Sequence, residues 1–353
     1  FSGFPVKIEC LKSNLTPREK SRIIESVQSG DTDILIGTHS IIQDNVRFLN
    51  LGLIIVDEQH KFGINQRALL TLKNSENPSI PHELYLSATP IPRSLSLVLY
   101  EGLDYTIISE SPKNRKTINT QMIDHDKRSI LHDNISKILH DKEQVYWVCS
   151  CIDYTESSES EYVQGVYEDL SNRFATTSIG MLHGRVDSKE NIKTMKKFVS
   201  GEIQILVCTT MIEVGVDVAN ATCIVIEDPN RFGLSQLHQL RGRVGRSEKQ
   251  SYCYLVCKNN LSDHALYRLK ALELNSSGFK IAEEDLKLRG SGDYLGHKQS
   301  GANHNFKLAT PDDALNNYDL VRESMNCVDK IDEESKNKLI KRWGKDSAET
   351  IQL

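Results

Sequence analysis

Residues 51–60 read "LGLIIVDEQH" and indicate the fold class more directly than any other stretch of the chain. The run up to Val56 is apolar throughout, which is typical of a strand that other elements cover on both faces of a parallel sheet. Asp57 and Glu58 follow at the point where such a strand leaves the sheet. Ligands of open parallel sheets bind outside the carboxyl ends of the strands, so this acidic pair is a candidate binding site.

The same arrangement repeats along most of the chain. Further apolar runs occupy 33–37, 83–87, 144–149, 178–182, 204–208, 222–226 and 252–257. Helical patterns lie between them, and one at 188–201 places Ile192, Met195 and Val199 on one face and ends at Gly201. Strands that alternate with helices predict an α/β fold built on parallel sheets.

The chain of 353 residues is long enough for about two domains of ordinary size. A polar segment at 109–119, which contains Pro112, is typical of a linker between two α/β blocks. The strand signal ends after Cys257, and the remainder looks helical apart from a glycine-rich stretch at 289–301. We expect three parts, at 1–112, 113–258 and 259–353.

Composition and charge exclude several classes of protein. The net charge of −5 argues against a protein that binds nucleic acid over its whole surface, but not against one that holds a phosphate backbone with a few donors. No apolar run approaches the roughly 20 residues that cross a bilayer, and no signal peptide is recognisable, so we expect a cytoplasmic protein without a membrane partner. The chain begins at Phe1 rather than at Met, which indicates an internal piece of a longer protein.

Most of the eight cysteines lie in apolar runs. Their close pairs are spaced Cys-x-Cys and Cys-x-x-x-Cys, unlike the Cys-x-x-Cys pairs of zinc sites, and no histidine stands at ligand spacing. We expect small buried residues in reduced cytosolic strands, and no zinc.

The acidic pair suits a nucleotide site. An aspartate at a strand end can hold Mg²⁺, and an adjacent glutamate can orient or deprotonate an attacking water. The alternative is a solvated turn, because Asp-Glu pairs are common.

The segment "HQLRGRVGRS", residues 238–247, is more specific. Arg241, Arg243 and Arg246 lie within six residues, and two interleaved glycines let the backbone approach a ligand closely. Arginines placed in this way neutralise the charge on phosphate oxygens during phosphoryl transfer. A solvated basic loop is the alternative, although it does not require the glycines.

Other polar clusters also follow apolar runs. The hydroxyls of Ser87 and Thr89 can bond the carboxylates and report the nucleotide state, or they are ordinary turn formers. Thr209 and Thr210 can donate to a sugar-phosphate backbone, and Asp217 can accept from a hydroxyl or hold an arginine of the neighbouring loop.

Two shorter clusters, "GTH" at 37–39 and "LHGR" at 182–185, can offer donors to phosphates at the same sheet edges. All these clusters follow apolar runs, so the pattern predicts two sheets whose carboxyl edges face a cleft. Carboxylates would line one side and arginines the other, so that ATP closes the cleft and hydrolysis reopens it.

Four strings occur in a fixed order: "DEQHKFGINQR" (57–67), "SATPIPRSL" (87–95), "RFGLSQLHQLRGRVGR" (231–246) and "IAEEDLKLRGSGDYLGHKQSG" (281–301). They resemble the superfamily 2 helicases, and among them the RecG family of bacterial ATP-dependent DNA helicases, from about Pro5 to about Met325. The resemblance implies two RecA-like parallel-sheet motor domains, the first truncated at its N-terminus, followed by a helical C-terminal region. It also implies a monomeric, ATP- and Mg²⁺-dependent translocase on duplex DNA that remodels stalled forks and Holliday junctions in repair and recombination, in the bacterial cytosol at the nucleoid.

The resemblance also assigns roles to single residues. Asp57 would coordinate Mg²⁺, Glu58 would be the catalytic base, Gln239 would belong to the nucleotide-sensing face, and Arg243 and Arg246 would be arginine fingers. The rest of the nucleotide-binding set would be His60, Ser87, Thr89 and Asp217. The residues that contact DNA or couple hydrolysis to movement would be Thr38, His39, Arg185, Thr209, Thr210, Arg289 and Gln299.

One departure from the family pattern limits this expectation. The sequence contains no Gly-x-x-x-x-Gly-Lys-Ser/Thr loop, and its only Gly-Lys pair, at Gly344 and Lys345, lacks the upstream glycine. Full-length relatives carry that loop and a wedge domain upstream of the position of Phe1, so we expect this chain to be inactive alone. Two alternatives stay open: a non-catalytic nucleic-acid-binding or interaction remnant of a split gene, and the motor portion of a transcription–repair coupling factor.

Overall fold

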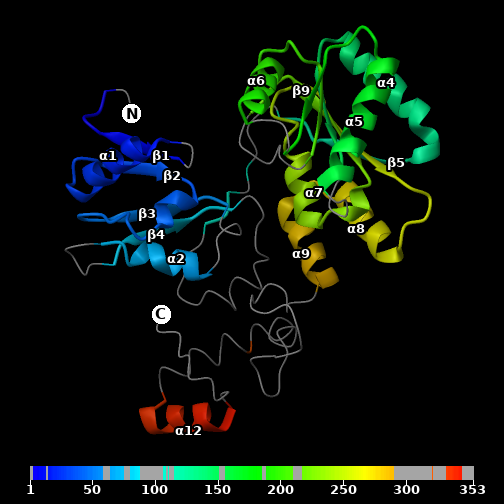
Figure 1. Cartoon of the computed structure of the whole chain (residues 1–353). Helices are drawn as coiled ribbons and strands as arrows, with labels where there is room; N and C mark the ends of the chain where they lie inside the picture. Colours follow the sequence, from blue (N-terminus) through cyan, green and yellow to red (C-terminus); the bar gives the residue numbers. More distant parts are fainter. Residues whose placement is uncertain are drawn as a thin grey trace. The chain divides into compact units, whose positions relative to one another are not determined.

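The computed structural model describes residues 3–12, 15–58, 64–74, 80–87, 106–108, 110, 115–150, 156–184, 188–209, 217–289, 320 and 331–343. The chain divides into two compact units, Phe1–Ala88 and Thr89–Leu353 (Figure 1). Both units contain parallel strands with helices between them, so the α/β prediction is confirmed. Residues 88–105 lie outside the described part, and the domain boundary at 112 stays a prediction.

The first unit contains two pairs of parallel strands, with a helix between the strands of each pair. Its elements are β1 (Ile8–Leu11), α1 (Pro17–Gln28), β2 (Ile34–Gly37), η1 (His39–Ile42), β3 (Leu53–Val56), α2 (Ile64–Thr71) and β4 (His82–Tyr85). Helix α1 begins with a capping box, in which Thr16 accepts from the backbone of Glu19 and the Glu19 carboxylate accepts from the backbone of Thr16.

The second unit is built on one sheet of six parallel strands in the order β5-β10-β9-β6-β8-β7. The strands are β5 (Asn119–Asp124), β6 (Gln144–Val148), β7 (Ile179–Leu182), β8 (Ile205–Cys208), β9 (Ala221–Glu227) and β10 (Tyr252–Cys257). The helices are η3 (His125–Lys127), α4 (Arg128–His140), α5 (Glu156–Arg173), α6 (Ser188–Val199), η5 (Pro229–Arg231), α7 (Leu234–Arg241), α8 (Asp263–Leu274), α9 (Gly278–Arg289) and α12 (Glu333–Trp343).

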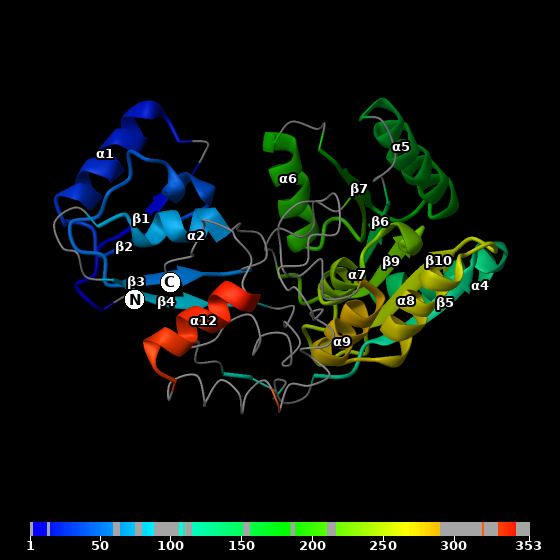
Figure 2. The same ribbon diagram turned by 90° about the horizontal axis from the view of Figure 1, so that it is seen from below.

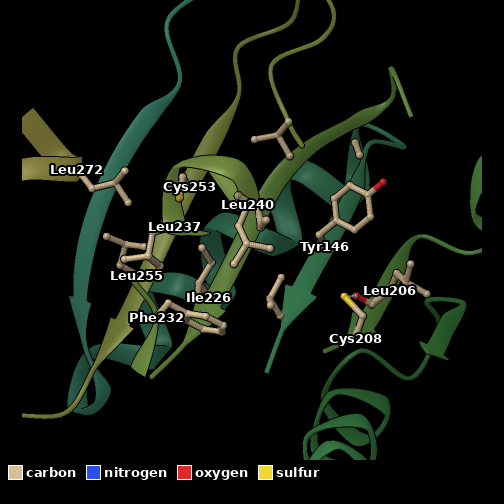
Figure 3. Close-up of a cluster of buried hydrophobic side chains, with 14 of the residues drawn as sticks. Tyr146, Leu206, Cys208, Ile226, Phe232, Leu237, Leu240, Cys253, Leu255 and Leu272 are labelled. Carbon is tan, nitrogen blue, oxygen red and sulfur yellow. Dashed lines mark hydrogen bonds between the residues drawn. The ribbon is translucent and has the colours of Figure 1, made fainter. Parts of the chain in front are cut away.

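The central strands of this sheet are buried on both faces, as the unbroken apolar runs predict. Tyr146 and Val148 of β6 point into a cluster that includes residues of α7 and α8, whereas Val145 and Trp147 point into a second cluster with α4 and α5. Figure 3 shows the first of these clusters, in which Tyr146 lies among side chains of the neighbouring elements. Burial on both faces fixes the carboxyl ends of the strands rigidly.

Two strands, β1 and β5, were not predicted. Strand β5 lies at one edge of the six-stranded sheet and alternates exposed with buried residues, and its sequence "NTQMID" is largely polar. An edge strand buries less surface than a central one, so the apolar signal on which the prediction relied is weak there.

The predicted contact face of the helix at 188–201 is confirmed for Met195, which packs against the core, and wrong for Ile192 and Val199. Helix α6 ends near Gly201, which has a φ of +82°, as expected. However, Ile192 and Val199 are about half exposed, whereas Phe198 is fully buried and Asn191 donates to the carbonyl of His183. The true inward stripe therefore includes a polar residue, which apolar periodicity cannot identify.

Candidate functional site

The carboxyl ends of β3 and β4 bring the predicted magnesium residues of the first unit together. The two strands pair in parallel with Val56 opposite Tyr85, and the backbone of Leu86 donates to the carbonyl of Val56 at 2.8 Å. Asp57 and Ser87 therefore leave the sheet at the same edge. Carboxylate and hydroxyl oxygens are ligands that suit Mg²⁺, so these residues fit the ion that the sequence implies.

The backbone of Glu58 is held in the left-handed region, with a φ of +53°. Its amide donates to the Asp57 carboxylate at 2.9 Å, which closes a tight turn directly after the strand. A residue other than glycine costs about 1–3 kcal/mol in this conformation, and such positions cluster at functional sites. The turn presents Asp57 to solvent and leaves Glu58 half-buried.

Thr38 and His39 follow β2, as predicted, and both are exposed. Gly37 precedes them, and a Cβ there would lie 2.6 Å from the carbonyl oxygen of Leu11. The close approach of the strand ends thus requires glycine immediately before the predicted DNA donors.

The arginine segment of the second unit forms the turn after α7. Gly245 has a φ of +74°, and a Cβ there would approach Ile118 to 2.8 Å. Arg246 then pairs with the Asp217 carboxylate at 3.5 Å and donates to the carbonyl of Gly242 at 3.2 Å. The interpretation that Asp217 holds an arginine of the neighbouring loop is therefore confirmed.

Arg243 and Arg246 lie close enough to the Tyr146 hydroxyl to influence it. Burial raises the pKa of Tyr146 strongly, and the two guanidinium groups act in the opposite direction. Arg243 is half-buried, and Gln239 lies one turn before it in α7. The turn that carries the two predicted arginine fingers packs at Gly245 against Ile118 and Ser251, which precede β5 and β10. The arginines therefore lie near the amino ends of these strands, and their predicted place at the carboxyl edge of the sheet is wrong.

Arg241 differs from the other two arginines, and its grouping with them as a phosphate ligand is wrong. It is 4% exposed and donates to the carbonyls of Leu272 at 2.7 Å, in the last turn of α8, and of Asn275 at 2.8 Å, directly after it. It also contacts Nδ1 of His238 at 3.1 Å. Burial, followed by the charge of Arg241, lowers the pKa of His238 to about 4, so this imidazole is neutral.

Further polar contacts that the sequence did not reveal join α7 and the segment directly before it to α8 and α9. Arg268 of α8 donates to the carbonyls of Phe232 and Asn230 at 3.1 and 3.0 Å, and Ser235 of α7 contacts the buried Asp285 of α9 at 3.2 Å. No local motif marks these residues. The contacts brace the segment that leads to Arg289.

Thr209 follows β8 as predicted, but it is only 4% exposed, which argues against a direct contact with DNA. Arg289 is the last residue of α9. The predicted site residues outside the described part of the chain are His60, Thr89, Arg185, Thr210 and Gln299.

A cavity of about 410 Å³ lies at the carboxyl ends of β5, β9 and β10. Its lining residues do not include Asp217, Gln239, Arg243 or Arg246. At its wall, the Glu227 carboxylate accepts from Trp147 at 3.0 Å and pairs with Arg128 at 2.5 Å. Burial raises the pKa of Glu227, and Arg128 opposes that effect.

Within the described ranges, no three histidine, cysteine, aspartate or glutamate residues are grouped as a metal site. In the same ranges, no helix combines the length and apolar character that a membrane crossing requires.

Three family models match the chain. They are described as DEAD/DEAH box helicase at 2–98, helicase conserved C-terminal domain at 126–248, and ATP-dependent DNA helicase RecG, domain 3, C-terminal, at 275–343.

Curated relatives match over most of the chain. The ATP-dependent DNA helicase RecG of Thermotoga maritima is 41% identical over 93% of this chain and 42% of the relative. The protein of the same description from Escherichia coli K12 is 40% identical over 90% of this chain and 46% of the relative. The chain thus spans less than half the length of these relatives.

Solved structures agree. A RecG bound to a three-way DNA junction is 38% identical, with a TM-score of 0.65, over 91% of this chain and 40% of that chain. Mss116p bound to ssRNA and AMP-PNP is 17% identical, with a TM-score of 0.56, over 82% of this chain and 61% of that one, and it supports the fold alone.

Proposed function

Because this chain belongs to the RecG family of DNA helicases, we propose that it is the motor portion of an ATP-dependent helicase that acts on branched DNA. The relatives carry that description, and one solved relative is bound to a three-way junction. The proposal extends to stalled forks and Holliday junctions as substrates and to duplex DNA as the track.

The observation that carries the proposal is that the two units hold different groups for phosphoryl transfer. Asp57, Glu58 and Ser87 lie at the edge of the first unit, and Arg243 and Arg246 lie in the turn after α7 of the second. Carboxylates for a metal and guanidinium groups for phosphate oxygens are the two kinds of group that phosphoryl transfer requires.

Each residue then has a defined task. Asp57 would hold Mg²⁺, and Glu58 would orient the attacking water and take its proton. Arg243 and Arg246 would stabilise the charge that develops on the transferred group, while Gln239 would sense the nucleotide. Bound Mg²⁺·ATP supplies the phosphoryl group and part of the charge neutralisation.

Coupling to DNA would pass through α8 and α9. Their polar contacts with α7 connect the arginine turn to Arg289, the last residue of α9. We expect Arg289→Ala or Gln299→Ala to preserve part of the DNA-stimulated hydrolysis and to abolish fork unwinding. Unwinding at the parental rate per ATP consumed would contradict this role.

The proposal is tested with Glu58→Gln in the full-length protein. This change keeps the size of the side chain but removes the base, so hydrolysis stimulated by branched DNA should be lost while ATP binding persists. Glu83→Gln is a matched control, because Glu83 is an exposed carboxylate on the neighbouring strand β4.

Two outcomes would contradict the proposal. One is hydrolysis at the parental rate in Glu58→Gln. The other is a parent protein that binds DNA but releases no phosphate from ATP with any branched DNA, which would favour the non-catalytic alternative.

A further inference from the structure

The polar segment that leads into strand β5 lies against the arginine turn, residues 242–246. Residues 115–118 of this segment precede β5 and belong to the predicted linker. The backbone of Asn119 donates to the carbonyl of Ser251 at 2.9 Å, where the ladder between β5 and β10 begins. These two strands lie side by side in Figure 2. The segment and the arginine turn thus meet near the amino ends of the two strands.

Three contacts join the segment to the chain around the arginine turn. Nε of Arg115 donates to the carbonyl of Gly245, although the two residues are 130 positions apart in the sequence. The side chain of Gln250 donates to the carbonyl of Thr117 at 2.9 Å. Ile118 packs closely on Gly245, where a Cβ would lie 2.8 Å from the Ile118 side chain. Because Gly245 also has a φ of +74°, any residue with a Cβ would be strained there.

The segment is itself anchored in the second unit. Ile118 packs against the core cluster that contains Leu240 and Val244. The side chain of Arg115 is exposed, and the carbonyl of Gly245 is its one hydrogen-bond partner among the residues that the structure describes. Arg115 therefore connects a fixed support to the arginine turn.

The bond from Arg115 acts on the peptide group that carries Arg246. The carbonyl of Gly245 and the amide nitrogen of Arg246 belong to one planar unit. Glycine adopts φ values of either sign at similar energy, so this unit can rotate more freely than it could after another residue. A hydrogen bond from a charged donor is stronger than one between neutral groups. It fixes the direction in which the chain, and with it the Arg246 side chain, leaves Gly245.

We propose that Arg115 is a positioning residue for the arginine finger Arg246. The inference rests on the proposed function and deepens it, because Arg115 holds the turn that presents a guanidinium group to phosphate oxygens and does not itself contact the nucleotide. Donors stabilise a transition state best when they are held in place before the reaction. The position of the finger is thereby tied to the segment that is predicted to link the two α/β blocks.

The first test measures steady-state ATP hydrolysis by the full-length protein with forked DNA. Arg115→Ala should lower kcat by about ten- to a hundredfold, the factor expected for the loss of one hydrogen bond to a charged group. KM for ATP and the affinity for DNA should stay at the parental values, because a displaced finger weakens only transition-state contacts. Lys116→Ala is the matched control with parental kcat, since Lys116 is an exposed cation next in the chain.

Two further variants separate positioning from a direct effect of charge. Nε2 of glutamine is as many bonds from the backbone as Nε of arginine, so Arg115→Gln keeps a donor for Gly245 and removes the charge. It should recover most of the rate that Arg115→Ala loses. The double variant of Arg115→Ala and Arg246→Ala should be as slow as Arg246→Ala alone, because a positioning residue has no effect once the residue that it positions is absent.

Hydrogen exchange of the full-length protein gives a readout that does not depend on catalysis. The backbone amides of Arg243 and Val244 donate to the carbonyls of Leu240 and Arg241 at 3.0 and 3.2 Å. In Arg115→Ala, these amides should exchange faster than in the parent, because the turn opens more often. The Lys116→Ala control should exchange at the parental rate.

Three kinetic results would overturn the inference. They are a parental kcat in Arg115→Ala, an Arg115→Gln variant as slow as Arg115→Ala, which would indicate that the charge itself acts on the nucleotide, and independent losses that multiply in the double variant. A parent protein without DNA-stimulated hydrolysis would instead contradict the proposed function. Hydrogen exchange would then decide the positioning role, since unchanged rates in Arg115→Ala overturn it and faster rates support it.

Discussion

Three arginines within six residues have different surroundings. Arg241 is buried and fully engaged with backbone carbonyls, whereas Arg243 is half-buried and Arg246 is held at the surface by Asp217. A guanidinium that is bound to several carbonyls cannot also reach a phosphate. Only Arg243 and Arg246 are therefore candidates for contact with nucleotide.

We expect Arg246→Ala, made in the full-length protein, to reduce ATP turnover by about 10³–10⁵ and to leave DNA affinity nearly unchanged. An arginine finger contributes a factor of this size in other nucleotide hydrolases. Phosphate release and DNA binding are measured side by side. Lys249→Ala is the control, because Lys249 is a nearby exposed cation that pairs with Glu143 at 3.2 Å. Equal losses of affinity and turnover would instead indicate a loop that binds the DNA backbone.

His238 should make stability depend on pH. Its pKa is about 4 in the folded protein, below the ordinary value of 6.5. Between these values the unfolded chain binds a proton that the folded chain does not, so the free energy of unfolding should fall as the pH drops from 6.5 to 4. Urea titrations of the parent and of His238→Gln should give different slopes of the unfolding free energy against pH in this window, in addition to a constant difference from the lost Arg241 contact. His140→Gln, which removes an exposed histidine, is the matched control.

At the scale of elements, the turn after α7 is held from two sides. Gly245 packs against Ile118. Arg241 joins α7 to the carbonyls of Leu272 and Asn275 at the end of α8. Arg268 and Asp285 add contacts from α8 and α9. The arginine turn and the two helices therefore form one packed body, which is a requirement for passing movement from nucleotide to DNA.

Arg241→Ala should reduce the free energy of unfolding of the second unit by roughly 2–5 kcal/mol, because it leaves several buried carbonyls without a donor. Arg241→Lys should recover only part of the loss, since an ammonium group cannot span the same carbonyls. Urea denaturation followed by fluorescence measures both variants. A loss within about 0.5 kcal/mol, as for ordinary surface changes, would contradict the bracing role.

At the scale of the whole molecule, the phosphate chemistry is divided between the two units. Among the described residues of the predicted nucleotide-binding set, Asp57 and Glu58 belong to the first unit, and Arg243 and Arg246 belong to the second. The sequence of this chain also contains no loop that cradles β- and γ-phosphates with a lysine.

We expect the purified 353-residue chain to release no phosphate from ATP, with or without forked DNA. Without a phosphate-binding lysine loop, the acidic pair cannot hold the nucleotide in position for attack. A coupled phosphate assay measures the rate. Steady release that disappears in Glu58→Gln would show that the chain hydrolyses ATP by itself.

The sequence alone determined the fold class and the position of most site residues. Unbroken apolar runs predicted the central strands, because a strand covered on both faces requires apolar residues at every position. Asp57, Ser87, Thr38 and Thr209 follow strands as predicted, whereas the arginine segment follows helix α7. The four ordered strings already pointed to the family. Apolar runs and motifs consist of residues that are close together in the sequence, so they can be recognised from residue pattern and spacing alone.

Only the tertiary structure decided which side chains are buried. Arg241 and Arg246 stand five residues apart in one motif, yet one is buried and the other pairs with Asp217 at the surface. Thr209 is buried at a strand end, and the inward stripe of α6 includes Asn191. Leu53 and Ile55 belong to an apolar run that predicts cover on both faces, yet they are 53% and 57% exposed. Burial depends on which distant elements pack against a residue, and local periodicity does not contain that information.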